Sequence, residues 1–409
     1  MFPNPNANRV GGGGGGGSSG AGNSQGLATT PGFYCGFLNA TGRVLHDVFV
    51  YQDTGMLGGV GADDPSLAGP GSGGAFLIEV DATQVDALAK HLKRYMLRSK
   101  LRLRVLDEDE CVAWHAWDDR GNASGPGLSA LLAPSEKPGA GPVILRDDRA
   151  PGLGYRVLSG GTRSGNGSGS GSPVPAPLQA AAGELGLEHA DDAAYRVRRY
   201  LLGVPEGQGE IPRGDALPLE SNMDLMGGID FRKGCYVGQE LTIRTRHRGV
   251  VRKRILPCVL YGGAAAGDGG DAGTQPPESL EYVPGWTTGP GGVAAEDVPH
   301  DLSIGREGKR GRSAGNWLAG VGNVGLALCR LQIMTDVQLP GDTAVAPFDP
   351  TNEFVMKWGS EVKEGSDKAE GEGGSDGVGA GAGAGKAVKI KAFVPGWLRT
   401  RLDESNVSH

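Results

Sequence analysis

The sequence contains no apolar run of the length, about 20 residues, that a transmembrane helix requires, although 38% of its 409 residues are hydrophobic. It also lacks a basic excess, because its formal net charge is -7. A chain of negative charge has no overall attraction for nucleic acid or for an anionic membrane surface. We therefore expect no membrane partner and do not favour nucleic acid, and local features have to identify the partners.

Cysteine is sparse as well: there are five, and no two stand in a C-x-x-C pair. They are Cys35, Cys111, Cys235, Cys258 and Cys329. An odd number of scattered cysteines argues against a disulfide framework and against a zinc site built by this chain alone. The pattern is typical of a protein from a reducing compartment.

Glycine is the residue in excess, with 74 positions. Its densest tracts cannot bury enough apolar surface to offset the entropy of ordering, so we expect them to be disordered. They span residues 11–17, 58–74, 160–171, 262–273 and 371–385. The sequence therefore predicts a disordered leader at 1–32, a first domain at 33–258 and a C-terminal domain at 259–409. The leader lacks the repeated arginines of a transit peptide, and no targeting signal can be read from it.

The first domain begins with a hairpin pattern. Residues 33–38 and 44–51 are rich in β-branched and aromatic side chains and flank a turn at 39–42. A buried strand is expected at 75–80. A helix capped by Asp81 or Thr83 should follow, since its apolar residues fall on one face. These residues are Val85, Leu88, Leu92 and Tyr95.

Further elements are expected along the chain. Leu101, Leu103 and Val105 alternate with arginines, which predicts a half-exposed strand. A second helix should open at Asp191 or Asp192 and end at Gly203. Short apolar segments at 321–331 and 388–394 predict a small C-terminal β-barrel or sandwich, of which we favour the barrel. Strands and helices mixed at short range indicate the α+β class.

Chemistry concentrates in the segment Lys233-Gly234-Cys235-Tyr236-Val237-Gly238-Gln239-Glu240, which we call the signature. Cys235 follows Lys233 by two residues, and a nearby positive charge stabilises a thiolate, the form that acts as nucleophile and binds metals. A single thiolate cannot hold an iron-sulfur cluster, so any further ligands would come from a partner or a small molecule. On composition alone, a lone cysteine is more often a buried small hydrophobe.

The signature resembles that of YgfZ-type proteins, which are iron-sulfur cluster assembly factors related to the glycine-cleavage aminomethyltransferase. The resemblance continues in the hairpin around Gly42, in Asp147, Arg149 and Arg156 of a D-x-R-x-x-x-L-G-x-R element, and in Gly203 to Gly207. It implies an aminomethyltransferase-like folate-binding fold with mixed sheets and helices, plus the C-terminal barrel. It also implies a role in maturing mitochondrial [4Fe-4S] proteins together with A-type scaffold proteins, and a location in the mitochondrial matrix.

The same resemblance assigns roles to residues. Cys235 would be the functional thiolate and a ligand of a transient cluster shared with a partner, and Lys233 would be its charge partner. A bound tetrahydrofolate would be contacted by a set on both sides of Cys235. This set comprises Glu220, Asn222, Tyr236, Gln239, Glu240 and Arg244. Glu220 can pair with the amino-pyrimidine edge of a pterin, because a carboxylate offers two acceptors to two parallel N–H donors.

Other interpretations stay open. A tetrahydrofolate-dependent aminomethyl or one-carbon transferase is the alternative function. A basic cluster from Arg244 to Arg254 could hold a folate tail, an acidic partner or RNA phosphates, although no interleaved aromatic residues support stacking with RNA. His46, Asp47 and His115 have no second metal ligand at useful spacing, so we expect them to satisfy local hydrogen bonds.

Overall fold

The computed structural model describes twelve stretches of the chain, which are residues 31–53, 75–99, 101–107, 110–119, 127–132, 141–160, 174–262, 275–287, 293–309, 311–340, 348–359 and 386–407. The leader and the glycine-rich tracts fall outside these ranges, except at their edges. By packing, the chain divides into an N-terminal unit, residues 1–195 and 206–249, and a barrel unit, residues 196–205 and 250–409. The expected boundary at 258/259 falls instead inside a strand of the barrel unit.

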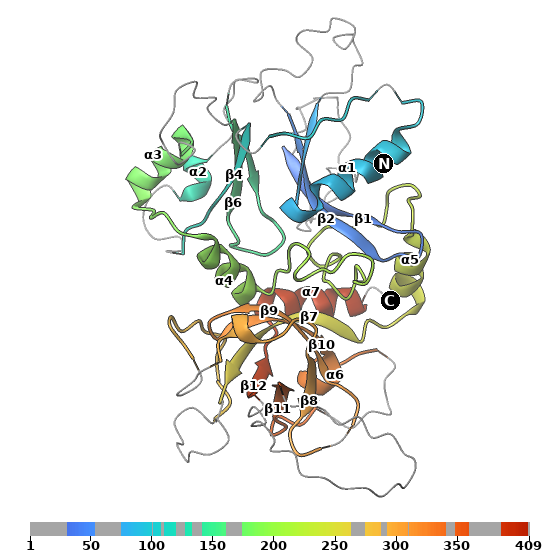
Figure 1. Ribbon diagram of the computed structural model, residues 1–409, viewed down its shortest axis with the longest axis vertical. Coiled ribbons are helices and arrows are strands. Elements are labelled where there is room, and N and C mark those ends of the chain that lie inside the picture. Colours follow the sequence, from blue (N-terminus) through green and yellow to red (C-terminus); the bar gives the residue numbers. More distant parts are fainter. Residues whose placement is uncertain are drawn as a thin grey trace, which may run out of the picture. The chain divides into compact units, whose positions relative to one another are not determined.

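The first sheet of the N-terminal unit is antiparallel, in the order β1-β2-β3, with β1 at Gly32–Leu38, β2 at Val44–Gln52 and β3 at Phe76–Val80. The predicted hairpin and the following strand are thus confirmed, but the strand is not buried as expected, because Phe76 is 50% exposed and the rest of β3 is half-buried. Helix α1 (Val85–Met96) covers one face, where Leu88 packs with Cys35, Val48 and Val50 (Figure 1). Side chains alternate along a strand, so Tyr34 and Asp47 lie on the opposite face, which we call the polar face.

The segment after α1 differs from expectation. Residues 101–107 form no strand, and Leu101 and Val105 are exposed, so that prediction is wrong. Tyr95, expected on the apolar face of α1, is 55% exposed. The strand that does form is β4 at Cys111–Ala116, in a second antiparallel sheet. Its order is β4-β6-β5, with β5 at Val143–Arg146 and β6 at Tyr155–Gly160.

Short helices cover the second sheet. Helices α2 (Leu128–Leu131) and α3 (Ala176–Leu185) bury Leu128, Leu178 and Ala181 against Val157 of β6. Helix α4 (Asp192–Leu202) begins where expected, with the Asp191 carboxylate accepting a hydrogen bond from the Ala194 N–H. It ends at Gly203, whose φ of 72° lies in the left-handed region that glycine favours.

The barrel unit contains a closed six-stranded barrel in the order β10-β7-β12-β11-β8-β9. The strands are β7 Lys253–Tyr261, β8 Ser303–Arg306, β9 Gly315–Val321, β10 Val324–Arg330, β11 Phe354–Trp358 and β12 Lys386–Ala392. Trp317 is fully buried, and Gly320 and Gly325, paired across β9 and β10, leave the space that its indole fills. The expected barrel is confirmed.

Two helices complete the barrel unit, α6 at Leu331–Met334 and α7 at Gly396–Val407. The α7 indole of Trp397 donates a hydrogen bond to the Leu202 carbonyl, 2.9 Å away. Within the described residues, no helix has the length and apolar character needed to cross a membrane.

Candidate functional site

The signature follows a turn-rich segment, residues 207–232, and its last two residues are the first two of α5 (Gln239–Arg248). Gly238 caps α5 with a φ of 79°, and a Cβ at this position would lie 2.1 Å from the Asn39 carbonyl oxygen. Gly42, in the β1–β2 turn, is matched to it, since a Cβ there would lie 2.9 Å from the Gly238 carbonyl oxygen. These two glycines therefore let the hairpin turn and the start of α5 pack backbone to backbone.

Cys235 is the one exposed cysteine of the five. Cys35, Cys258 and Cys329 are buried, and Cys111 is half-buried. Burial raises the pKa of Cys35 to about 12 and that of Cys111 to about 11, because desolvation penalises a thiolate. Cys258 and Cys329 lie side by side in the barrel core with their sulfurs 3.9 Å apart. Cys235 is therefore the most accessible of the five thiols.

Lys233, Tyr236 and Gln239 come together around the thiol-bearing turn. The Lys233 ammonium lies 3.9 Å from the centre of the Tyr236 ring, a cation–π contact. The Gln239 side-chain oxygen accepts a hydrogen bond from the Tyr236 N–H at 3.2 Å. Partial burial lowers the pKa of Lys233. Lys233, the expected charge partner of Cys235, is thus held by its contact with the Tyr236 ring.

The other residues predicted to contact folate fall into two groups. Glu240 and Arg244 are exposed on α5, with Glu240 in the first turn, where the helix dipole favours an acidic side chain. Asn222 is fully buried in the turn-rich segment with a φ of 59°, and Glu220 near it is half-buried. The two groups thus differ in exposure, and the folate contacts expected for all six residues stay a prediction.

The turn-rich segment packs on the polar face of the first sheet. A Cβ at Gly36 of β1 would lie 2.5 Å from the Met223 methyl group, and one at Gly228 would lie 2.9 Å from the Tyr34 ring. The turn-rich segment, which carries Asn222, thus covers the face of the first sheet that is opposite to α1. Tyr34 and Asp47 lie on this face. This face also meets Arg156 of β6 and Arg149 of the turn between β5 and β6.

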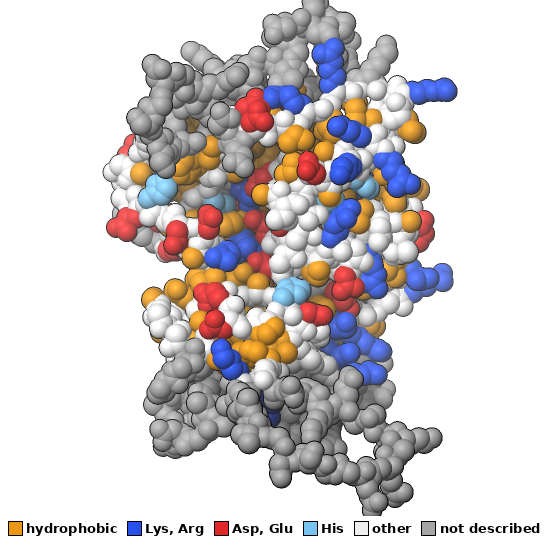
Figure 2. Space-filling view, viewed as in Figure 1, with side chains coloured by type: hydrophobic (Ala, Val, Ile, Leu, Met, Phe, Trp, Pro, Cys, Tyr) orange, Lys and Arg blue, Asp and Glu red, His pale blue; other side chains and the backbone are white. Residues whose placement is uncertain are grey.

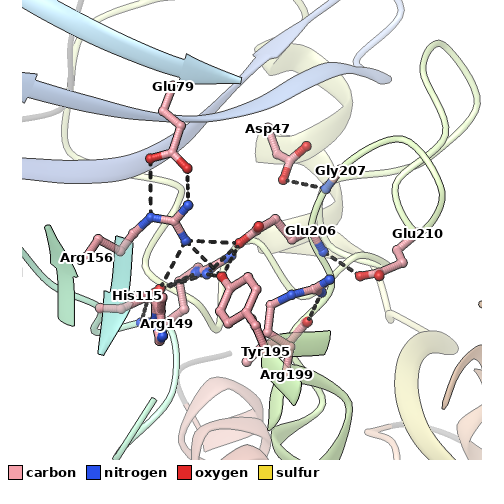
Figure 3. Close-up of polar contacts among 12 residues, drawn as sticks. Asp47, Glu79, His115, Arg149, Arg156, Tyr195, Arg199, Glu206, Gly207 and Glu210 are labelled. Carbon is pink, nitrogen blue, oxygen red and sulfur yellow. Dashed lines mark hydrogen bonds and ion pairs between the residues drawn. The ribbon is translucent and has the colours of Figure 1, made fainter. Parts of the chain in front are cut away.

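Arg149 and Arg156 form a buried network with acidic residues and Tyr195 (Figure 3). Arg149 binds Asp147 through two nitrogens at 2.9 and 2.7 Å and contacts Glu206 at 2.7 Å. Arg156 pairs with Glu79 and lies 3.2 Å from Glu206. The Tyr195 hydroxyl accepts hydrogen bonds from both guanidinium groups and donates one to Glu206 at 2.8 Å.

The two guanidinium groups offset the cost of burying the carboxylates. Burial alone would raise the pKa of Asp147, but the charges of Arg149 and Arg156 and the hydrogen bonds to the carboxylate together outweigh burial and hold that pKa well below its usual range. Both guanidinium groups also lie over the Phe49 ring, at 4.7 and 4.1 Å from its centre. The sequence singled out Asp147, Arg149 and Arg156 through the family resemblance, whereas their partners Glu79 and Tyr195 carried no local signal.

Asp47 and Tyr34 contribute unpaired polar groups to the same face. One Asp47 oxygen accepts a hydrogen bond from the Gly207 N–H at 3.1 Å, while the other has no partner among the described residues. The Tyr34 hydroxyl, also buried, likewise lacks a partner there. Burial raises the pKa of Asp47 to about 6. A small polar molecule could satisfy both groups, since buried polar atoms are normally hydrogen-bonded.

The two histidines behave differently from expectation. His46 is buried, neither ring nitrogen has a hydrogen-bond partner within the described part of the chain, and burial lowers its pKa to about 4. The prediction that it satisfies a local hydrogen bond is wrong. His115 faces Asp147, with 3.8 Å between its Nε2 and the nearer carboxylate oxygen. Among the described residues, no group of three or more His, Cys, Asp or Glu side chains could hold a metal ion.

Comparison with known proteins gives strong matches over most of the chain. A protein of Pyricularia oryzae, named iron-sulfur cluster assembly factor IBA57 homolog, mitochondrial, is 48% identical over 92% of this chain and 78% of its own length. Proteins of the same name from Chaetomium globosum and Neurospora crassa are 47% and 46% identical, over 93% and 90% of this chain and 75% and 73% of their own lengths.

No family model matches the chain. Among solved structures, the glycine cleavage system aminomethyltransferase T from Bartonella henselae is similar, with a TM-score of 0.47 and 12% identity over 88% of this chain and 75% of that one.

Proposed function

The chain belongs to the family of IBA57-type mitochondrial iron-sulfur cluster assembly factors, and from this membership we propose that it supports the maturation of mitochondrial [4Fe-4S] proteins through Cys235. The observation that carries the proposal is the exposure of this one thiol among five cysteines. The relatives are mitochondrial by name, and the chain is assigned to the mitochondrion. The matrix is the proposed compartment within it.

Cys235 acts in this proposal as one ligand of a cluster that is cargo rather than a resident group. Thiolates are the usual ligands of iron-sulfur clusters, and each cluster needs several of them. The described residues offer no metal-binding group around Cys235, so the remaining ligands come from the partner that presents the cluster. An A-type scaffold protein is the proposed partner. Lys233, held over the Tyr236 ring of the same turn, is the proposed charge partner of the thiol.

Cells whose only copy carries Cys235→Ala test this function. We expect aconitase activity to fall selectively, while a mitochondrial enzyme without a cluster keeps its activity. Cys111→Ala is the matched control, because Cys111 is the other cysteine that is not fully buried. Unchanged aconitase activity in the Cys235→Ala cells would make that thiol structural and overturn the proposal.

Tetrahydrofolate is the second element of the proposal. The polar face of the first sheet fits such a molecule chemically, because the free Asp47 oxygen can accept from an N–H and the Tyr34 hydroxyl can donate. Glu220 and Asn222 lie on the segment that packs on this face, and they would hold the pterin edge. When bound, tetrahydrofolate supplies a carrier for one-carbon units.

Calorimetric titration of the full chain with tetrahydrofolate tests this binding. Asp47→Asn should weaken it at least tenfold, because the amide replaces one acceptor with a donor, whereas Glu184→Gln, at an exposed position of α3, should leave it unchanged. Equal affinity of the Asp47→Asn variant would remove Asp47 from the site.

The alternative function, a tetrahydrofolate-dependent transferase, has one specific observation in its favour. Asp47 is a buried carboxyl with its pKa raised to about 6, close to the range in which a group can both take and release a proton at neutral pH. Formation of methylene-tetrahydrofolate from the glycine-cleavage intermediate, lost in Asp47→Asn, would support the transferase. No turnover would leave the assembly role as the function.

A further inference from the structure

Two cations near Cys235 are fixed on aromatic rings of the same loop. Lys233 lies over Tyr236, as described above, and the Arg246 guanidinium carbon lies 5.0 Å from the centre of the Phe231 ring. Phe231 precedes Cys235 by four residues, and Arg246 comes from the last turns of α5. A cation–π contact restrains a long side chain at little cost. Positive charge is therefore held in place on rings of the segment that carries the exposed thiol.

Arginines continue along α5. Arg244 and Arg248 are exposed and four residues apart, so they share one side of the helix. Within the described stretches, neither of them nor Arg246 forms an ion pair with a carboxylate. The last turn of a helix favours positive charge, but this alone does not require several arginines. Arg246 is two residues from each of them, so it projects from the other side of the helix, where it lies over Phe231. We call Arg244 and Arg248 the arginine face.

The arginine face contrasts with the chain as a whole. The net charge is -7, so a local group of unpaired arginines is not a consequence of general basicity. Figure 2 shows lysine and arginine side chains gathered over α1 and α5 of the N-terminal unit. Val237, between Cys235 and α5, is 47% exposed, which adds a small apolar contact beside the charges. An apolar centre with a charged rim is the usual anatomy of a protein interface.

The chemistry of the ligand follows from these features. Single-stranded nucleic acid is recognised through free aromatic rings that stack with bases. The rings nearest the arginine face, Phe231 and Tyr236, are already covered by Arg246 and Lys233. An acidic protein surface needs no such rings, and opposite charges across an interface accelerate association.

We infer that the arginine face is the docking surface for an acidic surface of the protein that presents the cluster to Cys235. The inference rests on the proposed function of Cys235 and adds the chemistry by which the partner is recognised. Docking there places the partner beside the thiol. The arginines set how fast the partner associates, whereas Cys235 acts after it has docked.

The association rate of the full chain with a cluster-loaded A-type scaffold protein tests the inference by stopped flow at low and high salt. Arg244→Glu combined with Arg248→Glu should slow association at least tenfold at low salt and flatten its salt dependence. The matched control is Lys357→Glu with Lys386→Glu, which makes the same size of charge change at two exposed lysines of the barrel unit. Arg248→Lys, which keeps the charge, should remain within about threefold of wild type.

The role of Cys235 and the docking surface can be tested separately. Cys235→Ser should associate at the wild-type rate while losing cluster ligation, so its behaviour reports on the thiol and not on docking. An unchanged rate for the arginine-face variant, or an equal loss in the lysine control, would overturn the docking surface. Loss of binding to single-stranded RNA with no change in scaffold association would overturn it as well, by assigning the arginines to nucleic acid.

Discussion

Gly238→Ala tests how the signature is held against the hairpin. The change places a Cβ at a φ of 79° and 2.1 Å from the Asn39 carbonyl oxygen, a backbone atom that no side-chain rotation can move away. A non-glycine residue in the left-handed region costs about 1–2 kcal/mol. Relief of the overlap, by moving the start of α5 off the turn, costs about 1–3 kcal/mol more. We therefore expect a loss of about 2–5 kcal/mol in the free energy of unfolding.

Gly186→Ala separates the two contributions. Gly186 ends α3 with a φ of 62°, and a Cβ there meets no atom within 4 Å, so that variant carries the conformational cost alone. Urea denaturation followed by circular dichroism gives both losses. The Gly238 variant should be the less stable by about 1–3 kcal/mol, and its Cys235 should react at a changed rate with a thiol reagent. Equal stability of the two variants would refute the backbone contact between α5 and the hairpin turn.

Two further predictions concern buried carboxyl groups. Asp147→Ala should lower the free energy of unfolding by about 3–5 kcal/mol in urea denaturation, because it leaves Arg149 buried beside an emptied partner position. Asp148→Ala, which breaks the exposed pair with Arg146, should lower it by less than about 1 kcal/mol. Similar losses in the two variants would contradict the buried network. The pKa of Asp47 is about 6 in the folded protein against 3.8 ordinarily, so the folded state binds this proton more firmly than the unfolded state. The contribution of Asp47 to stability therefore falls as pH rises from about 4 to 6. Asp47→Asn should therefore gain about 3 kcal/mol relative to wild type between pH 4 and pH 7, and a constant difference across that range would contradict its burial as a titrating group.

Local patterns in the sequence predicted the elements that depend on neighbouring residues. The hairpin at β1 and β2, the cap of α4 and strands β10 and β12 of the barrel were recognisable, because alternation, turn chemistry and capping act over a few residues. Leu101 and Val105 misled the assignment for the same reason, since their alternation with arginines is compatible with a strand but no partner strand pairs with it in the described residues. Strand β4, which does pair, was missed.

The site was predictable only in part. The signature directed attention to Cys235 because residue types and spacing carry that information, and its exposure agrees with a working thiol. The network around Arg149 and Arg156 depends on Glu79, Tyr195 and Glu206, which are brought together from distant parts of the sequence by tertiary packing. The Arg246 contact with Phe231 depends likewise on how α5 turns back on its own loop.

Native mass spectrometry of the full chain with a cluster-loaded A-type scaffold protein tests the role of Cys235 most directly. The account predicts a complex that carries an intact cluster with the wild-type chain and with Cys111→Ala, and a complex without a shared cluster with Cys235→Ser. A cluster retained equally by the Cys235→Ser complex would contradict the assignment of this thiol as the ligand.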